Sequence, residues 1–461
     1  MTELFDAIVI GAGQAGPSLA TRLAQQGRKV ALIERERLGG TCVNNGCIPT
    51  KTLVASARAA HIVRRARDFG VIASEPQIDM KAVMARKNAV VQASRDSLAQ
   101  WVGGTAGLEF IIGEARFSGP KTVHVGGREL SSPLIVINTG GRPVVPDWPG
   151  LEQVPYLTNI EMMDLDRLPA HLIVAGGSYI GLEFAQIFRR LGSEVSVVEY
   201  ADRLIAREDA AVSEAVREVL AAEGINFHVR ARDFAVEPDR NGVKLRLTSD
   251  NKPLIIEGSD LLLALGRRPN VEALGLDAAG IALDARGYIA VDDGLMTSAE
   301  GVFALGDVNG RGAFTHTSYN DYEILAANLD GDDRKLSDRV TAYALYTDPP
   351  LARTGMSDAA AAALGRPVLK AHMAMSRVGR ARERGETQGF MEVLVDAERK
   401  TILGATLFGI EADEVIHIFI QAMALNIPYT ELQKIVPVHP TVSELIPTLL
   451  DQLKPLRGIG S

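Results

Sequence analysis

The chain has 461 residues, which is enough for several domains, and 46% of them are hydrophobic, as in ordinary globular proteins. A net charge of −8 without a concentrated basic patch excludes a nucleic-acid surface, and no apolar run approaches the roughly 18 residues of a membrane span. Two cysteines are too few for a secreted disulfide scaffold, and the first residues do not read as a signal peptide. We therefore expect a cytoplasmic protein, in which a cysteine pair is more often catalytic than structural.

The first predicted unit is a βαβ unit. Residues 6–10 are mostly apolar, as expected for a buried parallel strand, and a helical pattern covers residues 17–26. A second strand follows at residues 29–33. The pattern is typical of a dinucleotide-binding fold.

The turn of this unit has the spacing Gly-x-Gly-x-x-Gly. Gly11 makes the tight turn, Gly13 lets the backbone approach a pyrophosphate, and Gly16 lets the helix pack closely on the strand. Glu34, at the end of the second strand, is placed to accept hydrogen bonds from ribose hydroxyls. A glycine triplet alone is weak evidence, but its strand, helix and acidic residue make a binding site the favoured interpretation.

Both cysteines lie in the stretch Gly-Gly-Thr-Cys-x-x-x-x-Cys-x-Pro-x-Lys, residues 39–51. A helix-like run, residues 51–67, follows them. A helix that starts there would lower the pKa of Cys47, because unpaired N–H groups and the helix dipole favour a thiolate. The alternative is that Cys42 and Cys47 are buried structural residues. The glycine and proline framing favours a redox pair.

This stretch resembles the redox motif of the flavin-dependent disulfide reductases, a family that includes lipoamide dehydrogenase, glutathione reductase and mercuric reductase. The next segments are consistent with the resemblance. A long helix is predicted at residues 81–101 and short strands at residues 110–130. An apolar strand at residues 134–138 ends in Thr139 and Gly140, and four prolines then mark a linker. The strand resembles the segment that returns the family's chain to the flavin domain.

A second βαβ unit has the same residue spacing as the first. Its strand at residues 171–175, glycine turn at 176–181 and helix at 182–191 lead to a strand that ends at Glu199. The first glycine and the acidic residue are 23 positions apart in both units. Two such units suggest one dinucleotide that stays bound and one that binds and leaves. The resemblance assigns FAD to the first unit and a nicotinamide coenzyme to the second.

Two residues of the second unit bear on its coenzyme. Ser178 replaces the middle glycine, which predicts weaker binding or a displaced backbone. A carboxylate at Glu199 accepts hydrogen bonds from the ribose of NADH and repels the extra phosphate of NADPH. NADH is therefore preferred over NADPH.

Two further strands are predicted to return the chain to the cofactor. Residues 261–265 form an apolar strand before Gly266, and residues 302–305 run into Gly306 and Asp307. Open α/β sheets bind ligands at the carboxyl ends of their strands, and Asp307 stands at such an end. The resemblance gives Asp307 the ribityl chain of the flavin, whereas the alternative is that it caps a turn.

The last third of the chain resembles the family's dimerisation domain. A helix is predicted at residues 359–363, and three strands and two helices follow: 368–375, 390–396, 401–409, 411–424 and 442–453. His439 stands five residues before Glu444, whose carboxylate can fix the imidazole tautomer and raise its basicity. Without the resemblance, His439 would be a capping residue. With it, the pair acts on the disulfide of the other subunit, so a homodimer is expected.

The predicted fold class is α/β, with two Rossmann-like dinucleotide-binding domains, for FAD and NAD(P), and an α+β carboxyl-terminal dimerisation domain. The FAD-binding domain comprises residues 1–150 and 272–340, the NAD(P)-binding domain 151–271, and the dimerisation domain 341–461. The catalytic residues implied by the resemblance are Cys42, Cys47, His439, Glu444, Lys51 and Glu183. The cofactor-binding residues are Gly11, Gly13, Gly16, Glu34, Gly40, Thr41, Ala115, Thr139, Gly140, Gly306, Asp307, Gly176, Tyr179, Gly181, Glu199 and Gly266. No metal site is predicted.

The predicted function is that of an FAD-dependent NAD(P)H oxidoreductase. Electrons pass through the flavin and the Cys42–Cys47 disulfide to a small-molecule disulfide or metal-ion acceptor. The alternatives are a lipoamide dehydrogenase subunit of an acyl-transfer complex, a glutathione or mercuric reductase, and a redox sensor without turnover. Mercuric reductases need a second cysteine pair in the carboxyl-terminal tail, and residues 451–461 contain no cysteine.

Overall fold

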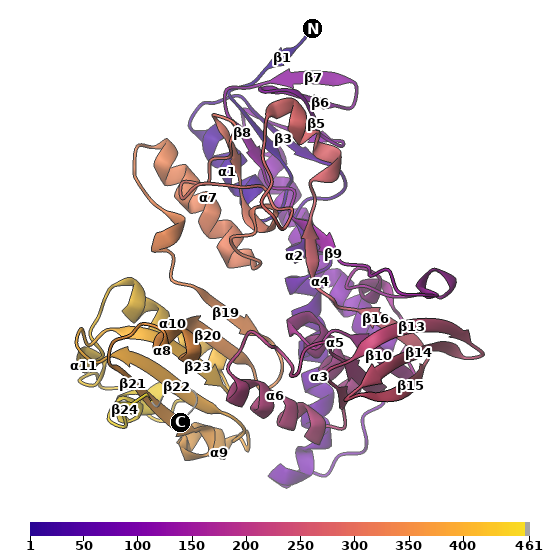
Figure 1. The fold of residues 1–461 in the computed structure, drawn as a ribbon, viewed down its shortest axis with the longest axis vertical. Coiled ribbons are helices and arrows are strands. Elements are labelled where there is room, and N and C mark those ends of the chain that lie inside the picture. The colour runs from indigo at the N-terminus through magenta and orange to yellow at the C-terminus, as the bar shows by residue number, and fades with distance from the viewer. Residues whose placement is uncertain (457–461) are drawn as a thin grey trace.

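The computed structural model describes residues 1–456 and contains three sheet-based parts (Figure 1). The first part is built on a five-stranded parallel sheet with the order β18-β8-β2-β3-β4. Its strands are β2 (Ala7–Ile10), β3 (Val30–Glu34), β4 (Leu108–Ile112), β8 (Ile135–Ile137) and β18 (Val302–Ala304).

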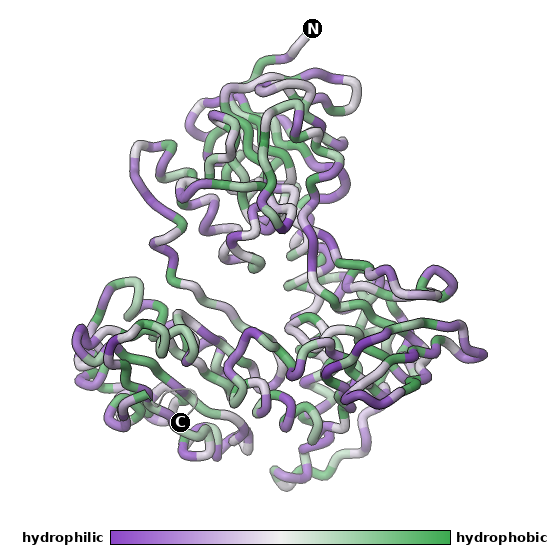
Figure 2. Tube along the Cα trace, in the orientation of Figure 1, coloured by the Kyte–Doolittle hydropathy of each residue, from purple (hydrophilic) through white to green (hydrophobic). Residues whose placement is uncertain are grey.

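Alternate side chains of this parallel sheet point to two different layers, as the period of a strand requires. Ala7 and Val9 pack with the helices α1 (Ala15–Gln25) and α7 (Thr315–Leu329), whereas Ile8 packs with a small mixed sheet on the other face. The small sheet comprises β1 (Glu3–Leu4), β5 (Arg116–Gly119), β6 (Thr122–Val125) and β7 (Arg128–Ser131). Figure 2 shows the apolar strands enclosed by polar loops.

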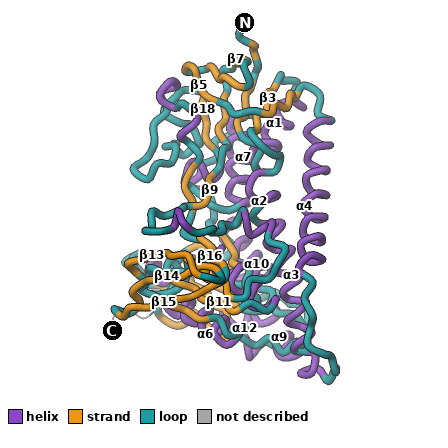
Figure 3. The backbone as a smooth tube through the Cα atoms, turned by 90° about the vertical axis from the view of Figure 1, so that its right-hand side faces the viewer, coloured by secondary structure: helices purple, strands orange, loops and turns teal. Residues whose placement is uncertain are grey.

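Three helices lie between β3 and β4, so this segment leaves the first sheet and returns to it. They are α2 (Gly40–Asn44), α3 (Cys47–Arg64) and α4 (Met80–Gly103), and the last two run along one side of the molecule (Figure 3). The side chain of Asp79 caps α4 by accepting a hydrogen bond of 3.0 Å from the Ala82 amide. Helix α3 packs against helix α5 of the second unit, so the cysteine-bearing segment joins both units.

The second part is a four-stranded parallel sheet covered by an antiparallel sheet of three strands. The parallel strands are β10 (His171–Ala175), β11 (Glu194–Val198), β12 (Asn226–His228) and β16 (Asp260–Leu263), and the helices are α5 (Tyr179–Leu191) and α6 (Ala210–Ala222). The antiparallel strands are β13 (Arg232–Asp239), β14 (Gly242–Ser249) and β15 (Lys252–Gly258). A two-stranded ribbon of β9 (Gly141–Pro143) and β17 (Arg267–Pro269) connects this part to the first.

The third part is a six-stranded sheet with the order β19-β20-β23-β22-β21-β24, in which all pairs are antiparallel. The strands are β19 (Ala342–Leu345), β20 (Leu351–Gly355), β21 (Val368–Ala374), β22 (Phe390–Asp396), β23 (Ile402–Phe408) and β24 (Lys454–Pro455). Its helices are α8 (Asp358–Ala362), α9 (Gly379–Glu383), α10 (Ala412–Ala424), α11 (Tyr429–Leu432) and α12 (Ile446–Leu450). The predicted α/β class with a separate α+β part is confirmed.

The prediction of a single helix over residues 442–453 is wrong. A short 3-10 helix, Ser443–Leu445, precedes α12, which ends at Leu450. Pro447 explains the break, because it has no N–H to continue the hydrogen bonds of an α-helix that started before it. Glu444 therefore lies in the 3-10 turn. Residues 457–461, the end of the predicted dimerisation segment, lie outside the described chain.

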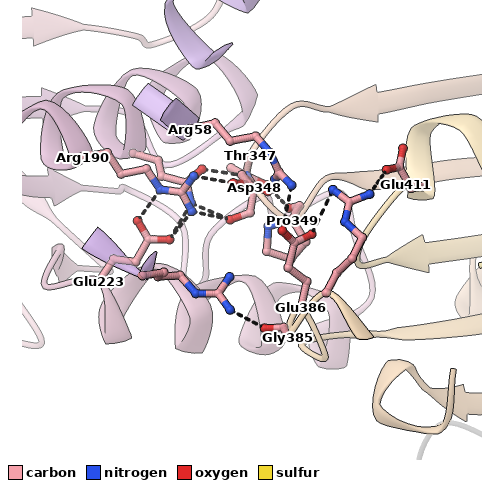
Figure 4. Close-up of polar contacts among 12 residues, drawn as sticks. Arg58, Arg190, Glu223, Thr347, Asp348, Pro349, Gly385, Glu386 and Glu411 are labelled. Atoms are coloured by element: carbon pink, nitrogen blue, oxygen red, sulfur yellow. Dashed lines mark hydrogen bonds and ion pairs between the residues drawn. The ribbon is translucent and has the colours of Figure 1, made fainter. Parts of the chain in front are cut away.

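A network of ion pairs fixes the third part against α3 and α5 (Figure 4). Arg190 of α5, whose side chain is 5% exposed, pairs with Glu223 at 2.7 Å and with Asp348. Arg58 of α3 pairs with Asp348 too, and with Glu386 at 2.8 Å. Asp348 and Glu386 of the third part are thus paired with arginines of α3 and α5. These two helices begin at Cys47 and Tyr179.

Candidate active site

A cavity of about 1450 Å³ lies where the first sheet, α3 and α5 meet. It extends from the first glycine turn and Glu34 to the two cysteines and the amino-terminal end of α5. Fifteen of the predicted site residues line it: Gly11, Gly13, Glu34, Gly40, Thr41, Cys42, Cys47, Lys51, Ala115, Thr139, Gly140, Tyr179, Glu183, Gly266 and Asp307.

The two cysteines stand on consecutive helices, Cys42 in α2 and Cys47 as the first residue of α3. Both are partly buried free thiols. The sulfur of Cys47 is 3.0 Å from the hydroxyl oxygen of Thr315, the first residue of α7. The hydrogen bond with Cys42 lowers the pKa of Cys47 to about 6, with the Thr315 hydroxyl and the Lys51 charge acting in the same direction and burial opposing them. The same pairing, together with burial, raises the pKa of Cys42.

The lowered pKa of Cys47 predicts a pH dependence that can be measured by alkylation. Because the thiolate is the reacting form, iodoacetamide should modify Cys47 of the reduced protein at a rate that falls as pH drops through about 6. Peptide mass spectrometry separates Cys47 from Cys42. Thr315→Val removes one hydrogen bond to the sulfur and should move the midpoint to higher pH. A wild-type midpoint near 8.5, the ordinary thiol value, would contradict the assignment.

Lys51 and Glu183 form an ion pair beside the cysteines. The ammonium nitrogen of Lys51 is 2.8 Å from a carboxylate oxygen of Glu183, whose side chain is 7% exposed. Glu183 also accepts a hydrogen bond of 2.9 Å from the amide of Tyr346, and the Lys51 nitrogen lies 4.6 Å from the centre of the Tyr346 ring. The positive charge is thereby held at the cavity wall.

The two glycine turns have the same geometry. A Cβ atom at Gly11 would lie 2.3 Å from the carbonyl oxygen of Asn138, and one at Gly176 would lie 2.3 Å from that of Ala264. In each case the neighbouring backbone belongs to the next parallel strand and leaves no room for a side chain. Gly16 and Gly181 approach their own turns closely, since their Cβ atoms would lie 2.1 Å and 1.9 Å from carbonyl oxygens of Gly11 and Gly176.

The two strand-end carboxylates also occupy equivalent positions. Glu34 accepts hydrogen bonds from the amides of Ala12, at 2.8 Å, and Glu36, at 3.0 Å. Glu199 accepts from the equivalent amides of Gly177, at 2.6 Å, and Ala201, at 2.8 Å. Each carboxylate is thus fixed against its glycine turn, where a ribose bound beside the turn would meet it.

The part of the cavity next to the first turn fits FAD. Gly13 lines the cavity, and a Cβ atom there would lie 3.3 Å from the Asn138 side chain, so a side chain larger than that of glycine would crowd the turn. Asp307 and Arg267 face each other at 3.6 Å, and the buried Nε of Arg267 has no hydrogen-bond partner among the described residues. Burial raises the pKa of Asp307. A glycine turn, a carboxylate and a guanidinium nitrogen without a hydrogen bond suit a group with phosphates and hydroxyls.

The remaining predicted residues do not line this cavity. Five lie behind its wall in the turns and strand ends, and two lie on the third part of the molecule: Gly16, Gly306, Gly176, Gly181, Glu199, His439 and Glu444. His439 is 80% exposed, and its Nδ1 is 2.7 Å from a carboxylate oxygen of Glu444. The imidazole and carboxylate are paired as expected, and neither lines the cavity that holds the cysteines of their own chain.

Several residues of the cavity were not singled out from the sequence, among them Thr315, Arg267 and Tyr346. Arg267 directly follows the predicted Gly266 and could have been read from the strand end. Thr315 is 268 positions from Cys47, and nothing local marks it. Within residues 1–456, no group of three or more His, Cys, Asp or Glu side chains is arranged to hold a metal ion. No helix of the same residues is long and apolar enough to cross a membrane.

The chain is similar to known proteins over most of its length. Residues 5–321 match the model of the pyridine nucleotide-disulphide oxidoreductases, and residues 341–450 match the dimerisation domain of the same family. The probable pyridine nucleotide-disulfide oxidoreductase RclA of Escherichia coli is 33% identical over 98% of this chain and 99% of its own. The dihydrolipoyl dehydrogenase of Thermus scotoductus is 33% identical, with 96% of both chains covered. A mercuric reductase of Bacillus cereus is 32% identical over 95% of this chain and 70% of its own.

Solved structures show the same arrangement. The HOCl-induced flavoprotein disulfide reductase RclA from Escherichia coli superposes with a TM-score of 0.88 at 33% identity, over 97% of this chain and 99% of that one. A Cu(II) complex of the same protein also matches with a TM-score of 0.88, over 96% of this chain and 99% of that one.

Proposed function

The chain belongs to the pyridine nucleotide-disulphide oxidoreductase family, and from this premise we propose that it transfers electrons from NADH through FAD and the Cys42–Cys47 pair to a small disulfide or a metal ion. The predicted resemblance is confirmed. The protein is a flavoprotein disulfide reductase that uses FAD and a pyridine nucleotide. The preference for NADH, the roles of individual residues and the acceptor are our proposals.

The assignment of ligands to parts follows the two glycine turns. The predicted FAD-binding domain, residues 1–150 and 272–340, binds FAD, and residues 151–271 bind the coenzyme. The described part of the predicted dimerisation domain, residues 341–456, forms the dimer interface. Glu199 favours NADH, because its carboxylate faces the position of the ribose hydroxyls and two backbone amides hold it there. The protein is a cytoplasmic homodimer. The family match to a dimerisation domain supports the homodimer.

The observation that carries the proposal is the environment of Cys47. Its sulfur meets the Thr315 hydroxyl at 3.0 Å inside the cavity that fits FAD, and its pKa is lowered to about 6. FAD bound in this cavity would supply hydride acceptance and two-electron transfer to the disulfide. The chain's residues then hold the products: Cys47 remains a thiolate near Lys51, and Cys42 is the thiol that meets the acceptor.

The electrons and protons balance over one cycle. NADH reduces the Cys42–Cys47 disulfide to the Cys42 thiol and the Cys47 thiolate and gives NAD⁺. The pair then reduces one acceptor disulfide, which takes the Cys42 proton and one proton from solvent to become two thiols, or it reduces two one-electron metal ions and releases the Cys42 proton. In both cases the Cys42–Cys47 bond forms again. His439 of the partner subunit takes and returns the proton of Cys42, and Glu444 orients it through the 2.7 Å contact with Nδ1.

The related proteins bear on the identity of the electron acceptor. The RclA structure with Cu(II) and the mercuric reductases favour a thiophilic metal ion, and the dihydrolipoyl dehydrogenases favour a disulfide. This chain has only two cysteines, so a metal ion would meet a single thiol pair rather than the two pairs expected of a mercuric reductase. We propose a Cu(II)-type ion as the first acceptor and a small disulfide as the second.

An anaerobic assay tests this function. Purified holoprotein should oxidise NADH faster than NADPH when Cu(II), lipoamide or oxidised glutathione is added one at a time. Turnover with Cu(II) alone supports the metal-ion acceptor, and turnover with lipoamide alone supports the dihydrolipoyl dehydrogenase alternative. Acceptor-independent oxidation of NADH, or equal rates after Cys42→Ser, would refute the relay.

A further inference from the structure

An arginine of the third part is bound to the loop that carries His439. The Nη2 of Arg380, the second residue of α9, donates a hydrogen bond of 2.7 Å to the backbone carbonyl oxygen of Pro440. The Nη1 of the same guanidinium pairs with Glu383, almost one helical turn further on, at 3.2 Å. Since Pro440 directly follows His439, the guanidinium contacts the backbone next to the imidazole-bearing residue.

Residues 438–444, which we call the His439 loop, have few other anchors. Within the described chain, Arg380 is the only residue outside this loop that hydrogen-bonds to residues 438–441. The remaining hydrogen bonds of these residues join members of the loop to each other. The His439 side chain is 80% exposed. Segments with exposed side chains and few bonds to the rest of the protein open easily, so the contact with Arg380 restrains this one.

The helix that supplies the arginine is itself fixed against the far end of the His439 loop. Ala381, next to Arg380, has no exposed surface and belongs to the same apolar cluster as Val442. Glu444 lies against the start of α9, because a Cβ atom at Gly379 would be 3.4 Å from its Oε1. The core thus holds α9 and the carboxylate end of the loop together, and the guanidinium holds the imidazole end.

We propose that Arg380 is a positioning residue for His439, and that it acts on the active site whose cysteines belong to the partner subunit. The inference rests on the proposed role of His439 as the acid–base group of that site. Glu444 fixes the imidazole ring through Nδ1, whereas Arg380 fixes the backbone that carries the ring. Both restraints are needed, because a proton acceptor has to lie within hydrogen-bond distance of the thiol that it serves.

The first test separates the two halves of the reaction in the Arg380→Ala holoprotein. Turnover with an acceptor should fall roughly 10- to 100-fold, the range expected when a catalytic group loses its fixed geometry. Hydride transfer from NADH to the flavin, followed by stopped-flow absorbance, should stay within a few fold of wild type, because it precedes any proton transfer at Cys42. Slowing of both steps to the same extent would overturn the inference, as would loss of FAD or of the dimer.

Arg384→Ala is the matched control. Arg384 lies four residues after Arg380 and is 39% exposed, against 38% for Arg380, but it pairs with Glu411 and not with the His439 loop. This variant should keep wild-type turnover. An equal loss in the two variants would show that any arginine of this segment has the same effect, and the assignment to Arg380 would be wrong.

Hybrid dimers separate action on the partner's site from damage within one subunit. A dimer of one Arg380→Ala subunit and one Cys42→Ser subunit has both defects at one active site, and its other site keeps an intact cysteine pair and an intact His439 loop. Purified through a different tag on each subunit, this hybrid should have roughly half of the wild-type turnover. Turnover no higher than that of the Arg380→Ala homodimer would show action within the same subunit and overturn the inference.

Failure of the proposed function would give other results. Wild-type protein that reduced no disulfide and no metal ion would refute that function. Wild-type turnover in His439→Gln would refute the role of the imidazole, and the inference would be wrong with it. If the wild type were active and His439→Gln were impaired, but Arg380→Ala matched the wild type, only the inference would be wrong.

Discussion

Cys42→Ser should reduce acceptor-dependent turnover by roughly 1000-fold or more, since removal of a nucleophile that forms a covalent intermediate costs at least this much. Serine fills the position of Cys42 and keeps a hydrogen-bond donor for Cys47, so the flavin site should remain intact. Stopped-flow mixing with NADH should therefore still bleach the flavin at a rate within a few fold of wild type. Steady-state assays with each acceptor measure the loss.

Cys47→Ser is the companion variant. It removes the sulfur that contacts Thr315, and it too should lose turnover with every acceptor. The wild-type rate of NADH oxidation with an artificial one-electron dye should persist in both variants, because such a dye takes electrons from the flavin directly. If Cys42→Ser kept more than a tenth of the turnover with Cu(II), the metal ion would be reduced at the flavin, and the protein would be a simple diaphorase.

Arg190→Ala should lower the free energy of unfolding by about 3–5 kcal/mol, the usual cost of removing one partner from a buried ion pair. The guanidinium is 5% exposed and binds carboxylates of two parts of the molecule, Glu223 and Asp348. Its loss leaves both with fewer partners and opens a gap between α5 and the third part. Urea unfolding followed by far-UV circular dichroism measures the change.

Arg217→Ala provides the control on the neighbouring helix α6. Arg217 pairs with Glu214 one turn away, and its side chain is 43% exposed. Exposed pairs of this kind contribute less than about 1 kcal/mol, so this arginine should be replaceable at little cost. Equal destabilisation by the two substitutions would show that the network of Figure 4 contributes no more than a surface pair.

The sequence predicts those parts of the site whose residues follow a local pattern along the chain. Both glycine turns, their strands and their strand-end carboxylates recur with one spacing, and the structure forms both units with matching hydrogen bonds. The helix after the cysteines is predicted at residues 51–67 from its local pattern, and the structure starts it four residues earlier, at Cys47, and ends it at Arg64. The alternation of Val243, Leu245 and Leu247 in β14 is also local, and reading it would have added the three-stranded sheet that the sequence analysis left unassigned.

The parts that the sequence did not predict depend on contacts between distant segments. The Thr315 hydroxyl contacts Cys47 from another helix. Glu208 accepts hydrogen bonds from residues of α5, β19 and β20. Such contacts follow from how the sheets are placed against each other, and no spacing along the chain encodes them. The helix predicted at residues 442–453 is wrong for a local reason, because Pro447 favours the first turn of a helix and α12 starts at Ile446.

The paired ribbon of β9 and β17 makes the second glycine-turn unit an insertion. The chain leaves the first sheet at Pro143 and comes back at Arg267, and these residues pair directly, so the inserted segment begins and ends at one place. Homologous segments can therefore be exchanged through a single two-stranded junction without changing the path of the first sheet. The shared core between α3 and α5 sets the limit: an exchanged segment must also present an apolar face that fits the helix bearing Cys47.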